Sequence, residues 1–207
     1  WHALLWPAML KSAGIPLPKT ILVNGFLNLN GQKISKSLGN IIRPTDWVKK
    51  YGSDAVRYYL LRYTNLTDDS DISEEKLIRA YNSDLANGLG NLVARVAKLC
   101  EVSNSLFEPN AVSKISDPVS ERIREFRFHD ALGIVYAAIN LVNTSINADE
   151  PWKLKGNDLQ KSLEKQVFRI RQVAVDLQPF LPETAGKIEN QFKGPKIKSQ
   201  KPLFPRI

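Results

Sequence analysis

Apolar residues recur every three or four positions through the second half of the chain. Between residues 77 and 96 they are Leu77, Tyr81, Leu85, Leu89, Leu92 and Val96. This spacing aligns them on one face of a helix several turns long, and such a face is normally buried against other helices. Residues 119–149 and 159–177 have the same character. The sequence therefore predicts a mostly α chain, with a helical bundle over residues 80–207.

The first forty residues indicate a different kind of structure. Residues 1–14 have helical spacing, with Gly14 as the end and a kink or break expected at Pro7. Residues 20–23 are short, apolar and β-branched, as in a buried parallel strand. A helix followed by such a strand suggests the last part of an α/β nucleotide-binding fold. Ligands of open α/β sheets bind beyond the carboxyl ends of strands, where the next loop begins.

That loop, residues 30–40, is polar and basic. Lys33 and Lys36 supply ammonium groups, Ser35 and Ser37 supply hydroxyls, and glycines at 31 and 39 permit positive φ. These groups suit a polyphosphate whose charge shifts during a reaction. The loop is not a Walker A loop, because Ser35 stands where that motif needs a glycine. A solvated basic loop is the alternative interpretation.

Residues 41–79 are predicted to form a helical unit between these two parts. Residues 44–46 predict the start of a helix, with Thr45 or Asp46 near its cap. This helix would bury residues 47, 48 and 51 and end at Gly52. A second helix carries Tyr58 and Tyr59, which we interpret as core residues. Residues 67–71 are acidic and are expected to be a loop, and residue 73 is a serine suited to cap the next helix.

Two features of the helical part lie outside the apolar stripe. Asn87, Asn91 and Arg95 follow one another every four residues, on a row separate from the apolar stripe. Two asparagines are less expected than an arginine on a plain surface row, because Asn is a mediocre helix former. Trp152 follows a proline after the second long helix, where it could anchor the core. The row formed by Asn87, Asn91 and Arg95 could simply be a hydrated surface.

Composition narrows the partners and the site types. The net charge is +8 and the pI is about 9.5, which favours a polyanionic partner such as nucleic acid. The single cysteine, Cys100, excludes an internal disulfide and a multi-cysteine zinc site in this chain, and we expect it to be a buried thiol. We expect no run of apolar residues in the chain to be long enough to span a bilayer, and therefore no membrane partner. The chain begins without Met or a targeting segment, which suggests a piece of a longer protein.

Several ordered blocks resemble methionyl-tRNA synthetases. Residues 24–26 and 31–40 resemble the KMSKS loop of class I aminoacyl-tRNA synthetases, with Ile34 in place of Met. Residues 54–61 resemble the stem-contact fold, and residues 82–95 resemble the first anticodon-domain helix. The segment with Asn143, Ile146, Pro151 and Trp152 resembles another family signature, in which Asn147 replaces the common Asp. The close of the chain, residues 201–207, also resembles the family.

The resemblance implies roles for particular residues. Those implied to bind ATP are Asn24, Gly25, Lys33, Ser35, Lys36 and Ser37. Lys33 and Lys36 would act in catalysis by holding the β- and γ-phosphates. Asn24 stands where the family usually has His. His2 and Trp6 would line the methionine pocket. Asn91, Arg95 and Trp152 would bind the anticodon, with the amide and guanidinium groups reading base edges and Trp152 stacking on a base.

The resemblance also implies a domain plan and an activity. Residues 1–40 would end a Rossmann-like catalytic domain, 41–79 would be the stem-contact fold, and 80–207 the anticodon-binding bundle. The implied reaction activates methionine with ATP and Mg²⁺ and transfers it to tRNA-Met, whose anticodon is CAU. The alternatives are a non-catalytic tRNA-binding module and a scaffold paralogue. For location, a mitochondrial matrix enzyme is slightly favoured over a cytoplasmic one.

Overall fold

Helices dominate the computed structural model, which describes residues 2–35, 39, 41–109 and 112–207. The elements in order are α1 (Leu5–Ser12), β1 (Leu27–Leu29), β2 (Gln32–Lys33), α2 (Pro44–Tyr51), α3 (Ser53–Tyr63), β3 (Ser70–Ile72), α4 (Glu74–Ala80), the π-helix η1 (Tyr81–Gly90), α5 (Asn91–Ser103), α6 (Asp117–Arg124), α7 (Phe128–Asp149), the 3₁₀ turn η2 (Pro151–Lys153), α8 (Gly156–Leu177) and α9 (Pro182–Phe192). The predicted mostly α fold class is confirmed.

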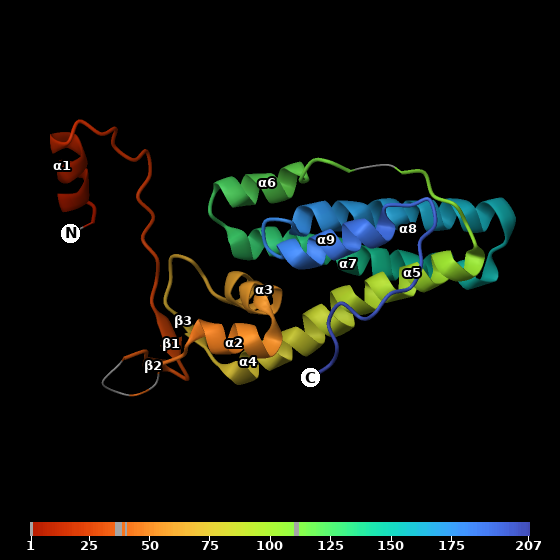
Figure 1. Ribbon diagram of the computed structural model, residues 1–207, viewed down its shortest axis with the longest axis horizontal. Helices are drawn as coiled ribbons and strands as arrows, with labels where there is room; N and C mark the ends of the chain where they lie inside the picture. The colour runs from red at the N-terminus through yellow and green to blue at the C-terminus, as the bar shows by residue number, and fades with distance from the viewer. Residues whose placement is uncertain (1, 36–38, 40, 110–111) are drawn as a thin grey trace.

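The helix α1 lies apart from the rest of the chain and is joined to it by a long extended segment (Figure 1). Pro7 falls in the first turn of α1, where its missing N–H costs no helical hydrogen bond, so the expected break is wrong. The strand expected at residues 20–23 is also wrong. These residues are extended but exposed and form no strand, because no described segment of this chain pairs with them.

A small sheet of order β2-β1-β3 follows the extended segment. The strands β1 and β2 are antiparallel, and Asn30 and Gly31 between them both have positive φ, which suits a tight hairpin. The strand β3 pairs parallel to β1, with Leu29 opposite Ile72. Part of the segment expected to be an acidic loop is therefore a strand. The Asn30 N–H donates to the Ile72 carbonyl at 3.3 Å, just before α4. The sheet therefore holds the described start of the basic loop at residues 30–40, here called the lysine loop, close to the helical region.

The helices α2 and α3 meet at Gly52, whose φ of 86° only glycine adopts readily. Trp47 and Tyr51 are buried as predicted, whereas Val48 is exposed. The helix α2 begins at Pro44 after Arg43, which confirms the helix start predicted at residues 44–46. Ser73 does cap α4, because its hydroxyl accepts a hydrogen bond from the Lys76 N–H at 3.2 Å.

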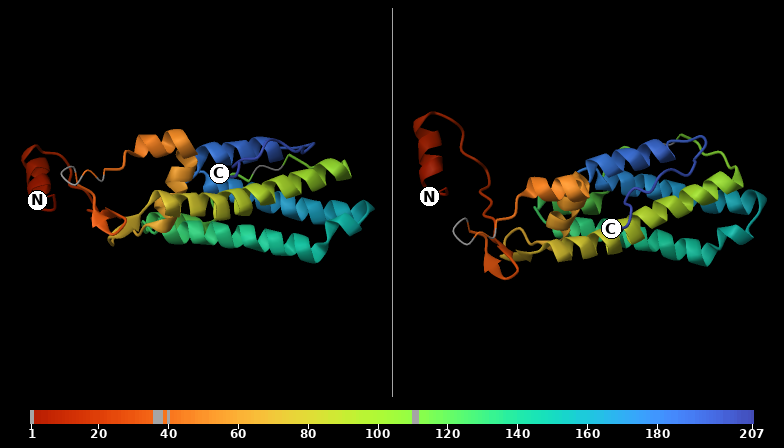
Figure 2. Two further views of the ribbon diagram at one scale, coloured as in Figure 1. Left: turned by 90° about the horizontal axis from the view of Figure 1, so that it is seen from below. Right: turned by 60° about the horizontal axis from the view of Figure 1, so that its bottom comes forward.

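The bundle is formed by a long helical rod and the helices that lie along it. The rod runs through α4, η1 and α5, and α7, α8 and α9 lie alongside (Figure 2). The predicted stripe is buried throughout: Leu77, Tyr81, Leu85, Leu89, Leu92 and Val96. The π-helical stretch within the rod was not predicted. Such stretches often occur near functional sites, and this one immediately precedes Asn91.

The helix predicted over residues 119–149 is in fact two helices. The chain turns between α6 and α7 at Phe126, whose φ is +60°. The Arg127 N–H bonds to the Arg122 carbonyl and closes the turn. Because the apolar period continues on both sides of the turn, sequence spacing does not reveal it.

By length and hydropathy alone, the segment Phe128–Lys153 could cross a membrane. The expectation that no apolar run is long enough to span a bilayer is therefore wrong. Its apolar residues Leu132, Val135, Ile139, Val142 and Ile146 are buried in the bundle core. Packing against the neighbouring helices therefore accounts for the apolar composition of α7.

Candidate functional site

One face of the bundle brings together Arg95 of α5, Asn147 of α7 and Trp152 of η2. Arg95 lies one helical turn after Asn91, the exposed first residue of α5. The Arg95 Nη2 donates a 2.8 Å hydrogen bond to the Asn147 Oδ1 near the end of α7. The Arg95 guanidinium also lies over the Trp152 ring, 5.5 Å from its centroid. Arg95 is thus held between an amide and an indole.

The local chain geometry explains why Trp152 is presented to solvent. Glu150 adopts a left-handed conformation that ends α7, and Pro151 is buried behind it. Lys153 pairs with Glu150 at 2.8 Å across the short 3₁₀ turn. Trp152 remains 53% exposed. The core-anchor alternative for Trp152 is therefore not supported, and the ring is available for stacking.

Asn147 belongs to this face but was not predicted as a site residue, and Asn87 was singled out only for its spacing. The sequence shows only that Asn147 retains hydrogen-bonding capacity, and its partner, Arg95, lies 52 residues away. Asn87 accepts hydrogen bonds from the Arg206 Nε and Nη2 at 3.0 and 2.7 Å. That second guanidinium therefore lies on the same face as Asn91 and Arg95. No sequence spacing links residues 87 and 206.

The lysine loop begins in the β1–β2 hairpin. Lys33 ends β2, and its Nζ lies 5.2 Å from the centroid of the Phe26 ring. Asp71 of β3 supports the hairpin by accepting a hydrogen bond from the Gly31 N–H, and it pairs with the Lys76 Nζ at 2.6 Å. These two donors, Lys76 first, lower the pKa of the Asp71 carboxyl. Ser35 follows β2 and is half-buried, while Lys36 and Ser37 lie outside the described residues.

Gly25 allows the segment before this hairpin to lie close against the backbone of residues 66–69. Its N–H donates to the Leu66 carbonyl at 2.9 Å. A Cβ at this position would lie 2.2 Å from the Asp68 carbonyl oxygen, so only glycine fits. The exposed Asn24 precedes it. The candidate ATP-binding positions 24 and 25 thus lie next to the hairpin that carries Lys33.

The candidate methionine-binding residues lie elsewhere. Trp6 is in α1 and is 53% exposed, and His2 lies in the turn before that helix. Because α1 stands apart from β1 and β2, the structure does not bring these two residues to Lys33 (Figure 1).

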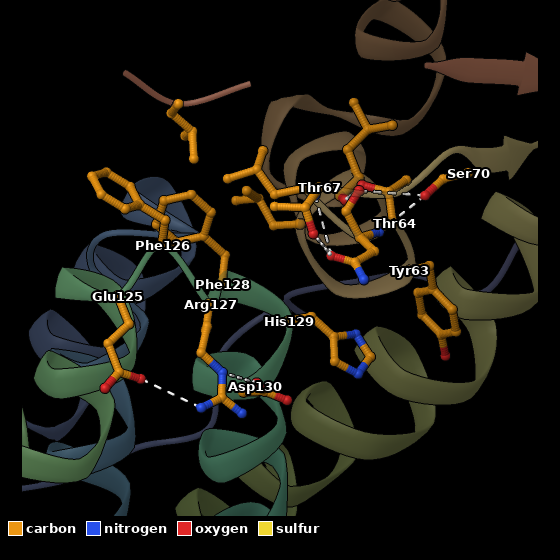
Figure 3. Close-up of a pocket in the computed structure, with 15 residues that line it drawn as sticks. Tyr63, Thr64, Thr67, Ser70, Glu125, Phe126, Arg127, Phe128, His129 and Asp130 are labelled. Atoms are coloured by element: carbon orange, nitrogen blue, oxygen red, sulfur yellow. Dashed lines mark hydrogen bonds and ion pairs between the residues drawn. The ribbon is translucent and has the colours of Figure 1, made fainter. Parts of the chain in front are cut away.

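A cleft of about 590 Å³ separates the end of α3 from the α6–α7 turn (Figure 3). Arg127 on its wall pairs with Asp130 at 2.7 Å and with Glu125 at 3.4 Å, and Arg62 contacts His129. Tyr63 and Phe126 add aromatic surface. The lining comes from distant parts of the sequence, so no motif reveals it. Among the described residues, no three His, Cys, Asp or Glu side chains are grouped so as to hold a metal ion.

Residues 1–97 match a protein family described as "tRNA synthetases class I (M)". Two curated relatives carry the name methionine–tRNA ligase. That of Fusobacterium nucleatum is 35% identical and aligns with 100% of this chain and 39% of its own length. That of Thermotoga maritima is 39% identical and aligns with 91% of this chain and 33% of its own length. This chain thus spans less than half the length of these relatives.

Solved structures give a similar result. The apo form of Mycobacterium tuberculosis methionyl-tRNA synthetase matches with a TM-score of 0.77 and 28% identity, over 100% of this chain and 47% of that one. The same enzyme bound by methionyl-adenylate matches with a TM-score of 0.81 and 29% identity, over 99% of this chain and 47% of that one.

Proposed function

This chain belongs to the methionyl-tRNA synthetases of class I and corresponds to one part of its relatives, and we propose that the full-length protein is a methionine–tRNA ligase. The observation that carries the proposal is 35% identity to a methionine–tRNA ligase along the whole of this chain. The polar hairpin and the exposed Arg95–Trp152 face support it, because they supply separate groups suited to nucleotide and to RNA.

The first proposed step activates methionine. A carboxylate oxygen of methionine attacks the α-phosphorus of ATP, the bond to the bridging oxygen of the β-phosphate breaks, and methionyl-adenylate and pyrophosphate form. Lys33 and Lys36 stabilise the charge that builds on the leaving pyrophosphate. Mg²⁺, which accompanies ATP, would neutralise further phosphate charge. Asn24, Gly25, Ser35 and Ser37 would contact the nucleotide, and His2 and Trp6 would contact methionine.

The second proposed step transfers the methionyl group. A ribose hydroxyl at the 3′ end of tRNA attacks the acyl carbon, and AMP leaves. The chosen tRNA is tRNA-Met, with Asn91, Arg95 and Trp152 contacting its CAU anticodon. The exposed indole offers a stacking surface, while the amide and guanidinium offer donors to base edges.

The test is the Lys36→Ala variant of the full-length protein, compared with wild type. We expect methionine-dependent pyrophosphate exchange to fall strongly while methionine binding, measured by equilibrium dialysis, is unchanged. A positive charge acting on the leaving group affects the transition state more than amino-acid binding. Unchanged exchange in this variant would refute the role of the loop.

A tRNA-binding module without catalysis is the second candidate. It is favoured by the Arg95, Asn147 and Trp152 contacts, which are complete within the bundle and need no other segment. Filter binding of tRNA with a CAU anticodon, beside pyrophosphate exchange by the same protein, separates the two. Binding without exchange would support the module, and both activities together would support the ligase.

A further inference from the structure

The Oδ2 oxygen of Asp149, the last residue of α7, is the meeting point of four side chains. The Gln166 Nε2 and the Ser162 Oγ, both on α8, donate to it at 3.2 and 3.5 Å. The Lys165 Nζ, also on α8, lies 3.6 Å from it. The Ser145 Oγ, one turn earlier in α7, donates at 3.3 Å. These contacts fasten the end of α7 to the side of α8.

The stability of α7 alone does not explain a carboxylate at this position. A negative side chain in the last turn of a helix is repelled by the negative end of the helix dipole, and the donors of α8 offset that repulsion. Gln166 is also not the most stable residue for its site. It is 0% exposed, and its Oε1 has no hydrogen-bond partner within the described part of the chain, which is destabilising. The amide is better explained by its Nε2, which donates to Asp149 and, at 3.1 Å, to the Ser145 Oγ.

The chain between Asp149 and Trp152 has little freedom to move. Only Glu150 and Pro151 lie between them. Pro151 is buried, and its ring fixes φ. Glu150 is left-handed, with φ of 42°, and its carbonyl accepts a 2.8 Å hydrogen bond from the Lys153 N–H. A displacement of Asp149 would therefore be transmitted to the indole.

The indole is thus held from two sides. The Arg95 guanidinium of α5 lies over its ring, and the contacts of Asp149 to α8 hold the turn that carries it. We propose that Asp149 and Gln166 are positioning residues, which set the direction in which η2 presents Trp152 to RNA. This inference rests on the proposed function, because it concerns the same face. A ring that is held in place before RNA arrives loses less conformational freedom on binding, so the affinity is higher.

The sign of one substitution separates position from charge. Asp149→Ala takes a negative charge away from the neighbourhood of the RNA, and by charge alone this strengthens binding to phosphates. We expect instead that it weakens the binding of an anticodon stem-loop RNA about threefold, a coupling usual for neighbouring residues. Filter binding with the full-length protein measures the affinity. The matched control is Asp158→Ala, which removes an exposed carboxylate from the first turn of α8 and should leave the affinity at or above that of wild type.

Gln166→Met is the second variant, since methionine has a similar size and lacks both polar atoms of the amide. It removes the donor to Asp149 together with the unpartnered Oε1, so the urea midpoint should stay at or above that of wild type. The stem-loop affinity should nevertheless fall about threefold. A purely structural role for the amide would leave the affinity unchanged in a variant as stable as wild type.

Both substitutions are then repeated in the Trp152→Ala background. Because they act through the indole, neither should weaken binding further there, and pyrophosphate exchange should be unchanged throughout. Losses that persist without the indole would overturn the positioning role, as would wild-type affinity in both single variants or an equal loss in Asp158→Ala. A wild-type protein that does not bind the stem-loop, or Trp152→Ala that binds it as well as wild type, would instead refute the proposed anticodon contact, and the positioning role with it.

Discussion

Trp152 presents its indole to solvent, with Arg95 over one face of the ring, so a base can stack only where the ring is open. We predict that Trp152→Ala weakens the binding of anticodon stem-loop RNA by about 1–3 kcal/mol, the value of one base–aromatic stack. Trp152→Phe should retain part of the affinity, since a smaller ring still stacks. Filter binding with the full-length protein measures both variants.

Phe168 of α8 is the control for that prediction. It is an aromatic residue of the same bundle, 52% exposed, and lies outside the Arg95–Trp152 face. Phe168→Ala should leave RNA binding unchanged. Equal losses in Phe168→Ala and Trp152→Ala would mean that exposed apolar surface, and not a stacking site, explains the effect.

Cys100 is buried in α5, and burial raises the pKa of its thiol to about 12. The native protein keeps a proton that the unfolded chain releases above a pH of about 8.5. The stabilising contribution of this thiol is therefore present below that pH and is lost as the pH rises towards 12. We predict that iodoacetamide at pH 8 labels Cys100 slowly in the native protein and rapidly in urea, as peptide mass spectrometry would show. Equal labelling rates would contradict its burial.

Single residues could be predicted from the sequence where their role depends on neighbours along one helix. The positions of Asn91 and Arg95 on one face follow from their spacing of four. Arg171 of α8, by contrast, is only 9% exposed, and its Nε donates to the Phe192 carbonyl at 2.9 Å at the end of α9. Burial lowers the pKa of that guanidinium. Its partner comes from another helix, and nothing in the local sequence identifies it.

At the scale of elements, Gly25 decides whether the segment before β1 can lie against residues 66–69. We predict that Gly25→Ala destabilises the full-length protein by about 1–3 kcal/mol, the usual cost of overpacking, because the new Cβ would meet backbone atoms that cannot turn away. Gly186 of α9 is the matched control, since a Cβ there meets nothing within 4 Å. Gly186→Ala should be neutral or stabilise by up to about 1 kcal/mol. Chemical denaturation compares the two, and equal midpoints would contradict the packing argument.

Elements that depend on their own periodicity were predicted well, and those that depend on partners were not. The stripe from Leu77 to Val96 defined the rod because one buried face suffices to specify a helix. Residues 20–23 have strand composition, yet a strand also requires a neighbour to bond to. The short strands β1 and β3 form where two segments some forty residues apart meet, and the turn at Phe126 depends on a single positive φ.

At the scale of the whole molecule, the net charge of +8 predicts that the proposed RNA binding depends on salt. Lys196, Lys198 and Lys201 are exposed in the segment after α9 and would contribute to binding through charge alone. We predict that changing all three to Gln makes the slope of log K against log salt shallower by about 0.7–0.9 for each RNA phosphate that these lysines neutralise in the wild-type protein. Trp152→Ala should instead lower affinity by the same factor at every salt concentration, because stacking releases no counterions. If the triple variant gave a line parallel to wild type, these lysines would lie outside the RNA path, and the excess charge relevant to binding would have to be sought on the face that holds Arg95 and Arg206.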